Sequence, residues 1–158
     1  MAEADGPRFL VDHMLGRLVT WLRLLGCDTA YAGKLDDAQI ARHAQQEGRI
    51  VLTRDRELAR RKSIRTILID SERVDEQIMQ VLQACDLSVG GREPRCAVCN
   101  GRLADLHREQ AKGQVPPYVF QTQERFLHCS DCGRIYWRGT HWEAMQRRLA
   151  RVAGHVAP

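Results

Sequence analysis

The chain has 158 residues, with 24 Lys+Arg against 20 Asp+Glu and a net charge of +4. This length fits one domain or two small ones, and no apolar run approaches the roughly 18 residues of a membrane-spanning helix. Residues 1–7 are acidic and polar and do not resemble a signal peptide. We therefore expect a cytoplasmic protein without membrane partners, whose thiols are free or metal-bound.

The first half of the chain alternates short apolar runs with helical patterns. Strands are predicted at residues 9–11, 29–31, 50–53 and 66–69, each followed by a helical pattern. Because these runs lack the alternation of a half-exposed sheet, a parallel sheet covered on both faces is favoured. We predict an α/β fold, with a small parallel sheet flanked by helices over residues 9–87 and an N-terminal tail over residues 1–8.

The second half is organised differently. Residues 88–94 contain a Gly-Gly pair and are predicted as a linker. Beyond the linker we expect a metal-binding ribbon over residues 95–142, with strands around residues 118–120 and 134–137. A C-terminal helix and tail are predicted over residues 143–158.

The start of the last helical pattern resembles a capping box. Thr140 and Glu143 have the required spacing, so the Thr hydroxyl can cap the helix while the Glu side chain reaches back. Leu149 and Val152 then fall on one apolar face.

Two identical C-x-x-C steps lie 29 residues apart, at Cys96, Cys99, Cys129 and Cys132. Two such turns supply the four thiolates of a closed tetrahedral zinc site. We therefore predict one structural zinc ion, with two disulfides or four unrelated thiols as the alternatives. Cys27 and Cys85 end predicted helices and are expected to be small apolar fillers.

The positive charge is unevenly distributed. Residues 1–92 carry 14 Lys+Arg and 14 Asp+Glu, whereas residues 93–158 carry 10 against 6, so the whole excess lies in the second half. Of the 24 basic residues, 21 are arginine, which contacts phosphate better than lysine does. This composition is compatible with nucleic-acid binding, although a solvated surface explains it equally well.

Acidic residues follow all four predicted strands: Asp12, the pair Asp36 and Asp37, Asp55, and Asp70. Each of them alone is explained as a helix cap, and Asp36 with Gln39 would form a capping box. However, the carboxyl ends of parallel strands meet at one edge of a sheet, and carboxylates gathered there repel one another unless a cation is bound. Oxygen ligands of this kind suit Mg²⁺ or Mn²⁺, which activate water and neutralise phosphate in phosphodiester cleavage.

Several motifs resemble the Mut-seven C-terminal RNase family, in which a compact PIN-like domain is joined to a zinc ribbon. They are the segments 12–18, 21–26 and 52–55, the first cysteine pair with Asn100 and Gly101, Pro116-Pro117-Tyr118, and 136–142. The resemblance implies metal-dependent endoribonuclease activity, with Asp12, Asp37 and Asp55 as ligands of one or two Mg²⁺ or Mn²⁺ ions. It also implies products with a 5′-phosphate and a 3′-hydroxyl.

One acid of the wider PIN pattern, often a glutamate in a helical segment, has no counterpart here. Asp36, Asp70 or Asp75 could substitute for it. Its absence keeps a second hypothesis open, in which the chain is an RNA- or ribosome-associated adaptor with little or no catalytic activity. A phosphoryl-accepting regulatory domain is disfavoured, because Asp12 stands alone and no lysine follows the fourth strand until Lys112.

The predicted partner is RNA, single-stranded or looped, with the ribbon aiding its binding. The basic residues predicted to contact RNA are Arg17, Arg23, Lys34, Arg54 and Arg56. His13 is a weaker candidate for a general base, because adjacent side chains at a helix start are expected to point apart.

Overall fold

The computed structural model describes residues 6–154, so most of the tail predicted over residues 1–8 and the end of segment 143–158 lie outside it. The first part is the predicted parallel sheet of four strands in the order β2-β1-β3-β4. The strands are β1 (Phe9–Val11), β2 (Thr29–Tyr31), β3 (Ile50–Thr53) and β4 (Thr66–Leu68). The helical elements are η2 (His13–Leu15), α1 (Gly16–Leu24), α2 (Asp37–Glu47), α3 (Arg56–Ala59) and α4 (Val74–Ala84).

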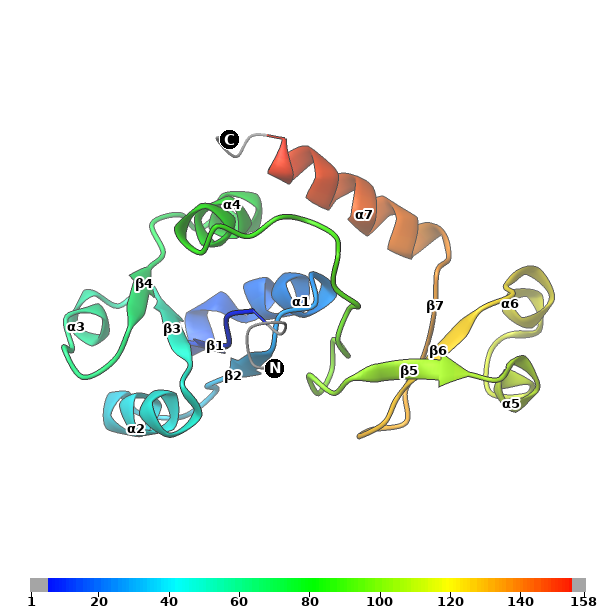
Figure 1. The fold of residues 1–158 in the computed structure, drawn as a ribbon, viewed down its shortest axis with the longest axis horizontal. Coiled ribbons are helices and arrows are strands. Elements are labelled where there is room, and N and C mark those ends of the chain that lie inside the picture. The colour runs from blue at the N-terminus through cyan, green and yellow to red at the C-terminus, as the bar shows by residue number, and fades with distance from the viewer. Residues whose placement is uncertain (1–5, 155–158) are drawn as a thin grey trace.

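Helices cover both faces of this sheet, which explains why its central strands are apolar throughout (Figure 1). Phe9 and Val11 of β1 pack with α1 and α4 in the larger core. Leu10, between them, packs on the opposite face with Ile40 of α2 and Leu58 of α3. The predicted α/β class with a parallel sheet is therefore confirmed.

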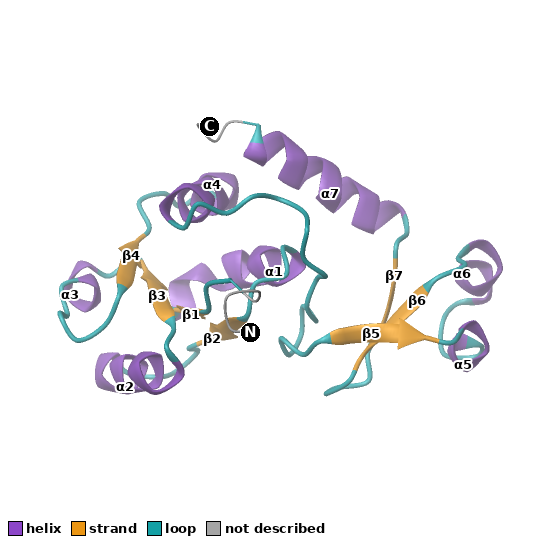
Figure 2. Ribbon diagram, viewed as in Figure 1, coloured by secondary structure: helices purple, strands orange, loops and turns teal. Residues whose placement is uncertain are grey.

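The second part is an antiparallel ribbon in the order β5-β6-β7 (Figure 2). Its strands are β5 (Leu103–Leu106), β6 (Phe126–Cys129) and β7 (Ile135–Trp137), and two short helices, α5 (Arg108–Ala111) and α6 (Pro117–Thr122), complete it. Its small core includes Ala111, Val115, Val119 and Phe126.

The prediction of a strand around residues 118–120 is wrong, because these residues form α6. Pro116 and Pro117 precede them, and proline at the first helical position has a φ already suited to a helix. The guanidinium of Arg108 lies 3.8 Å from the centre of the Phe120 ring and fixes the helix against α5. Sequence reasoning also missed β5 and β6.

The last helix, α7 (Thr140–Ala153), returns from the ribbon to the parallel sheet (Figure 1). Leu149 and Val152 enter the core formed with α1 and α4, and Arg148 Nε donates to Asp75 Oδ1 at 2.7 Å. The capping box predicted from Thr140 is wrong, because Gly139 is the N-cap and no side chain caps the helix.

Gly139 brings the chain close to a tryptophan ring. A Cβ atom at this position would lie 3.2 Å from Nε1 of Trp137, so the chain turns closely over that ring at the glycine. Among the helices between residues 6 and 154, none is long and apolar enough to cross a membrane.

Candidate functional site

The carboxyl ends of β1 and β3 lie side by side where the direction of the chain connections reverses. β1 continues into α1 on one face of the sheet, whereas β3 continues into α3 on the other face. Open parallel sheets bind ligands at such a switch point. We call this side of the sheet the C-terminal edge.

Asp12 occupies this point and is buried. Its Oδ1 accepts a hydrogen bond from the His13 amide at 2.8 Å, and its Oδ2 accepts one from Thr53 Oγ1 at 2.8 Å. The same Thr53 oxygen accepts the amide of Asp55 at 2.9 Å. A single buried hydroxyl therefore links the Asp12 carboxylate to the backbone of Asp55. Sequence reasoning missed Thr53, although a polar residue ending an apolar strand is a signal for such a role.

The other two predicted ligands begin helices on the opposite face. Asp55 is the N-cap of α3, and its Oδ1 accepts the Glu57 amide at 2.9 Å. Asp37 is the first residue of α2, and its side chain makes no hydrogen bond or ion pair with the described residues. Its neighbour Asp36 caps α2 and forms the predicted capping box with Gln39.

The three predicted ligands share this edge but do not form a tight cluster. In residues 6–154, only the cysteine group brings three or more His, Cys, Asp or Glu ligand atoms within 4.8 Å of one another. Asp12, Asp37 and Asp55 therefore do not meet that distance. Like charges repel at short range, and one oxygen of Asp55 is turned to its own helix. The ligand set remains a prediction.

The acids considered as a fourth ligand have other surroundings. Asp70 lies exposed beyond β4, where its amide donates to Gln80 Oε1 at 3.1 Å. Asp75 is taken up by its ion pair with Arg148. Asp36 is engaged as the cap of α2.

His13 lies closer to Asp12 than expected. Its Nδ1 is 3.0 Å from Asp12 Oδ1, although most of the ring is exposed. The expectation that adjacent side chains point apart is wrong here, because Asp12 is extended as the N-cap of η2 and turns its carboxylate over His13. Tyr31 supports this turn by donating its hydroxyl to the His13 carbonyl at 2.9 Å.

Four of the five predicted RNA contacts also belong to the C-terminal edge. Arg17 lies near the start of α1, Lys34 lies in the β2–α2 connection, and both are exposed. Arg54 and Arg56 flank Asp55, with Nη1 of Arg54 lying 3.6 Å from Glu72 Oε1.

Arg23 is different, because it is buried between the sheet and the ribbon. Its Nε donates to the carbonyl of Thr29 at 3.0 Å, and its Nη1 donates to the carbonyl of Ala97 at 2.9 Å. Burial lowers the pKa of this guanidinium below its ordinary value. These contacts give Arg23 a structural role, and its burial disfavours the predicted contact with RNA.

The four predicted zinc ligands come together in the ribbon. The Sγ atoms of Cys96 and Cys132 lie 3.7 Å apart, and those of Cys99 and Cys129 lie 3.4 Å apart. A tetrahedron with Zn–S bonds of about 2.3 Å has edges of about 3.8 Å, whereas a disulfide needs about 2.05 Å. The group therefore fits a tetrahedral metal such as zinc.

Backbone and side chain around the cysteines support metal binding. A Cβ atom on Gly101 would lie 2.5 Å from Cys129 Sγ, so only glycine fits there. The Tyr136 hydroxyl lies 3.0 Å from Cys96 Sγ and accepts the Ala97 amide at 3.1 Å. Burial would raise the pKa of the Cys96 thiol, but the hydrogen bonds from Tyr136 and from backbone amides lower it to about 6. The thiolate that a metal requires is thus favoured at Cys96. At Cys99 the Gly101 amide would lower the pKa, but the hydrogen bond with the Cys129 thiol raises it.

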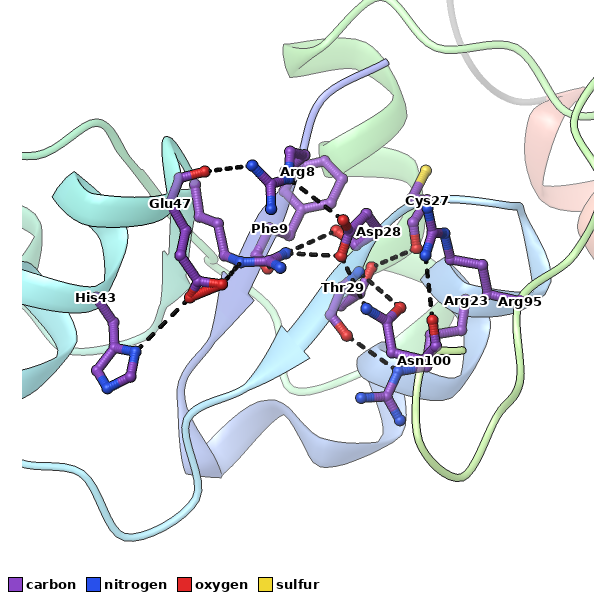
Figure 3. A network of polar contacts seen from close by, with 11 residues as sticks. Arg8, Phe9, Arg23, Cys27, Asp28, Thr29, His43, Glu47, Arg95 and Asn100 are labelled. Atoms are coloured by element: carbon purple, nitrogen blue, oxygen red, sulfur yellow. Dashed lines mark hydrogen bonds and ion pairs between the residues drawn. The ribbon is translucent and has the colours of Figure 1, made fainter. Parts of the chain in front are cut away.

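The opposite side of the sheet, which we call the N-terminal edge, joins the two parts of the chain (Figure 3). Asp28 accepts hydrogen bonds there from Arg8 at 3.2 Å, Arg49 at 2.8 Å and Asn100 at 2.7 Å. Asn100, which follows the first cysteine pair, also accepts the Thr29 amide through Oδ1 at 3.0 Å. The first cysteine turn is therefore fastened to the start of β2.

This network changes the ionisation of its central acid. Burial would raise the pKa of Asp28, but the hydrogen bonds from Arg49 and Asn100, with the nearby charges of Arg49 and Arg95, lower it to about 2. Asp28 is therefore an ionised structural carboxylate.

Fold and site together define a compact α/β domain with carboxylates at its C-terminal edge and a four-cysteine ribbon at its N-terminal edge. The Mut7-C RNAse domain model matches residues 7–149, and the chain belongs to this family. Membership indicates a nuclease-type function with RNA as the substrate. No curated protein and no solved structure matches the chain.

Proposed function

We propose that the protein is a metal-dependent endoribonuclease that cleaves single-stranded or looped RNA at the C-terminal edge of the sheet. The observation that carries this proposal is the state of Asp12. Its carboxylate is buried at the switch point, yet no lysine or arginine of the described residues pairs with it. A buried carboxylate without such a partner favours the binding of a cation.

The residues at this edge fit a hard divalent ion. Asp12 accepts hydrogen bonds from a backbone amide and a hydroxyl, which leaves further lone pairs on its two oxygens. Asp37 has no competing contact in the described residues, and one oxygen of Asp55 is not used for capping. Mg²⁺ and Mn²⁺ prefer such oxygen ligands. Asp12, Asp37 and Asp55 would hold one or two of these ions.

The bound ion would lower the pKa of water and neutralise charge on the phosphate. The residues of the chain supply the positioning. Thr53 fixes the orientation of Asp12 by donating to Oδ2, and Arg17, Lys34, Arg54 and Arg56 would bind non-bridging oxygens of the flanking phosphates. Attack of the water oxygen on phosphorus then breaks the bond to the 3′ oxygen. That oxygen takes up a proton, leaving a 3′-hydroxyl and a 5′-phosphate.

We propose zinc as the metal of the four cysteines, in a structural role. Four thiolates complete its tetrahedral shell and leave no position for water or substrate. The ion would hold the ribbon together and keep its first turn in place against Asp28 and Thr29.

The adaptor hypothesis is the second candidate. Two observations favour it. The oxygens of the three carboxylates do not all lie within 4.8 Å of one another, and Asp36 and Asp75 are engaged in other contacts. An adaptor would bind RNA through the same basic residues without cleaving it.

The decisive experiment is cleavage of a labelled mixed-sequence RNA in Mn²⁺, in Mg²⁺ and without added divalent ion. The zinc content of the protein is measured in each condition, so that a loss of activity caused by loss of zinc is not mistaken for a loss of the catalytic metal. Asp12→Asn is compared with Asp86→Asn, which removes an exposed carboxylate at a left-handed position that asparagine tolerates. We expect cleavage that depends on Mn²⁺ or Mg²⁺ from wild type and Asp86→Asn, and cleavage slower by about 10²-fold or more from Asp12→Asn. Binding without cleavage by wild type supports the adaptor, and cleavage by Asp12→Asn at the wild-type rate contradicts the proposed site.

A further inference from the structure

Two adjoining hollows follow the linker at the N-terminal edge, on the side of the sheet away from Asp12. One, of about 260 Å³, is lined by Leu24, Leu25, Arg92, Arg138 and Trp142 among others. The second, of about 340 Å³, is lined by Gly26, Arg92, Arg95 and Arg102 among others. Arg92 and Pro94 line both hollows, so the two hollows lie next to each other along the linker. We call the two together the linker groove.

The linker groove is strongly basic. Among the residues that the structure describes, four arginines line it, at positions 92, 95, 102 and 138, and one acid, Glu93. Arg92 donates one Nη1 bond to the Ser88 carbonyl at 3.2 Å, and Arg95 donates one to the Asn100 carbonyl at 3.1 Å. A guanidinium has five N–H donors, so each keeps donors for a further acceptor. A chain of phosphates complements such a lining.

One wall of the groove is apolar. Trp142 stands there with Leu24 and Leu25 from the end of α1, and the guanidinium of Arg138 lies 5.5 Å from the centre of the indole ring. Single-stranded nucleic acid presents charged phosphates beside flat apolar bases. Proteins bind it by placing basic and aromatic side chains together.

Backbone contacts fix the groove in place. A Cβ atom on Gly26 would lie 2.5 Å from Arg92 Cβ and 2.7 Å from the Glu93 carbonyl oxygen, so the linker lies directly on the end of α1. The Arg95 amide donates to the Arg23 carbonyl at 2.7 Å, and residues 95 and 102 form an antiparallel bridge. The groove is therefore preformed, which reduces the ordering that binding would require.

We propose that the linker groove is a second RNA site, which holds the backbone of a single strand away from the point of cleavage. The choice of RNA as its ligand rests on the proposed function, but the binding itself does not need catalysis. Strands of three residues span roughly 10 Å, so one RNA strand of several nucleotides can contact both edges. Short oligonucleotides that reach only the C-terminal edge are then poor substrates through a high KM, with kcat little changed.

The test measures RNA binding without turnover, by fluorescence anisotropy in an Asp12→Asn background. The double variant Arg92→Gln/Arg138→Gln removes two charges from the groove, and Arg60→Gln/Arg61→Gln removes two exposed charges beyond α3 as the matched control. We expect the groove variant to weaken binding by roughly 10-fold or more. The slope of the logarithm of the binding constant against the logarithm of the salt concentration should become shallower by about 0.7 for each lost phosphate contact.

A second double variant and a second ligand, polyglutamate, make the result unambiguous. Arg92→Lys/Arg138→Lys keeps the charges and should retain most of the salt dependence, and the melting temperature of each variant confirms folding. Equal RNA affinity in the groove and control variants would overturn the proposal. So would loss of binding to polyglutamate with RNA binding unchanged, since the groove would then suit an acidic protein segment.

Failure of the groove and failure of the nuclease remain distinguishable. Cleavage that depends on Asp12, with RNA affinity unaffected by the groove variant, contradicts the groove alone. Weakened RNA binding in the groove variant of a protein that does not cleave supports the groove and contradicts the nuclease.

Discussion

The two edges of the parallel sheet each centre on an aspartate with low exposure, and the two carboxylates have different partners. At the N-terminal edge, Asp28 is surrounded by Arg8, Arg49 and Asn100. At the C-terminal edge, Asp12 accepts from Thr53 and the His13 amide, and the described residues offer it no lysine or arginine. The first carboxylate is neutralised by the protein, whereas the second retains its capacity to bind a cation.

This difference separates a structural acid from a candidate functional one more clearly than burial does. Removing one partner of a poorly exposed ion pair strongly destabilises the fold, because the other charge remains without a partner. A buried carboxylate that no lysine or arginine pairs with can lose its charge without leaving a buried guanidinium or ammonium group unpaired. Replacing the aspartate by asparagine should therefore lower stability at the N-terminal edge, and should lower turnover with little change in stability at the C-terminal edge.

The largest expected effect is removal of the metal from the four cysteines. In small zinc modules the binding free energy of roughly 10–16 kcal/mol is largely folding free energy. Cys132→Ser, or stripping of the metal, should unfold the ribbon and release the contacts of Asn100 with Asp28 and Thr29. Hydrogen exchange should then show lost protection in β5–β7 and at the start of β2, with β3 still protected. Unchanged exchange in the ribbon would mean that the metal does not hold it.

The next effect compares the two aspartates directly. Asp28→Asn removes the nearer acid of the Arg49 side chain, which is only 7% exposed, and leaves it Glu47 at 3.3 Å. The fold should be destabilised by about 2 kcal/mol, less than the roughly 3–5 kcal/mol of a charge left with no partner. Asp12→Asn should change stability by less than about 1 kcal/mol while reducing turnover by about 10²-fold or more. Urea unfolding and cleavage rates measure the two quantities. If Asp28→Asn abolished cleavage in a folded protein, the assignment of roles to the two edges would be wrong.

Acid should weaken the N-terminal edge. The pKa of Asp28 is about 2 in the folded protein, against an ordinary value of about 3.9 when unfolded. The unfolded state therefore binds the proton more readily than the folded state. Ionised Asp28 contributes about 2 kcal/mol to the free energy of unfolding; this contribution is complete above about pH 4 and disappears as the pH falls through about 2. Melting temperatures of wild type and Asp28→Asn should converge over this range. Metal release in acid affects both proteins, so the difference between them isolates Asp28.

The smallest predicted effect concerns the hydroxyl that links Asp12 to Asp55. Thr53→Val keeps the shape of a fully buried side chain but leaves Asp12 Oδ2 and the Asp55 amide without this partner, at a cost of about 1–3 kcal/mol. Turnover should also fall by roughly 10-fold, because Asp12 loses a group that orients it. Thr53→Ser retains the hydroxyl and serves as the control. Equal activity of the Val and Ser variants would show that the link is only structural.

Patterns of short range determined much of this protein. Continuous apolar strands separated by helical segments predicted the parallel sheet, because a strand buried on both faces has no polar alternation. The spacing of the cysteines predicted a metal site that the four Sγ atoms confirm in geometry. Asp36 and Gln39 predicted a capping box that the structure contains. Each of these features is encoded by short local patterns, although the two cysteine pairs themselves lie 29 residues apart.

Tertiary structure decided what each charged side chain does. The sequence did not single out Asp28, and it suggested that Arg23 contacts RNA. Both residues have partners that are distant in the chain; Ala97, a partner of Arg23, lies 74 residues away. Tertiary contacts also joined Thr53 to Asp12 across 41 residues and brought the linker onto Gly26 to form the basic groove. A carboxylate or guanidinium acts through whatever lies within a few ångströms of it, and only the folded chain sets those neighbours.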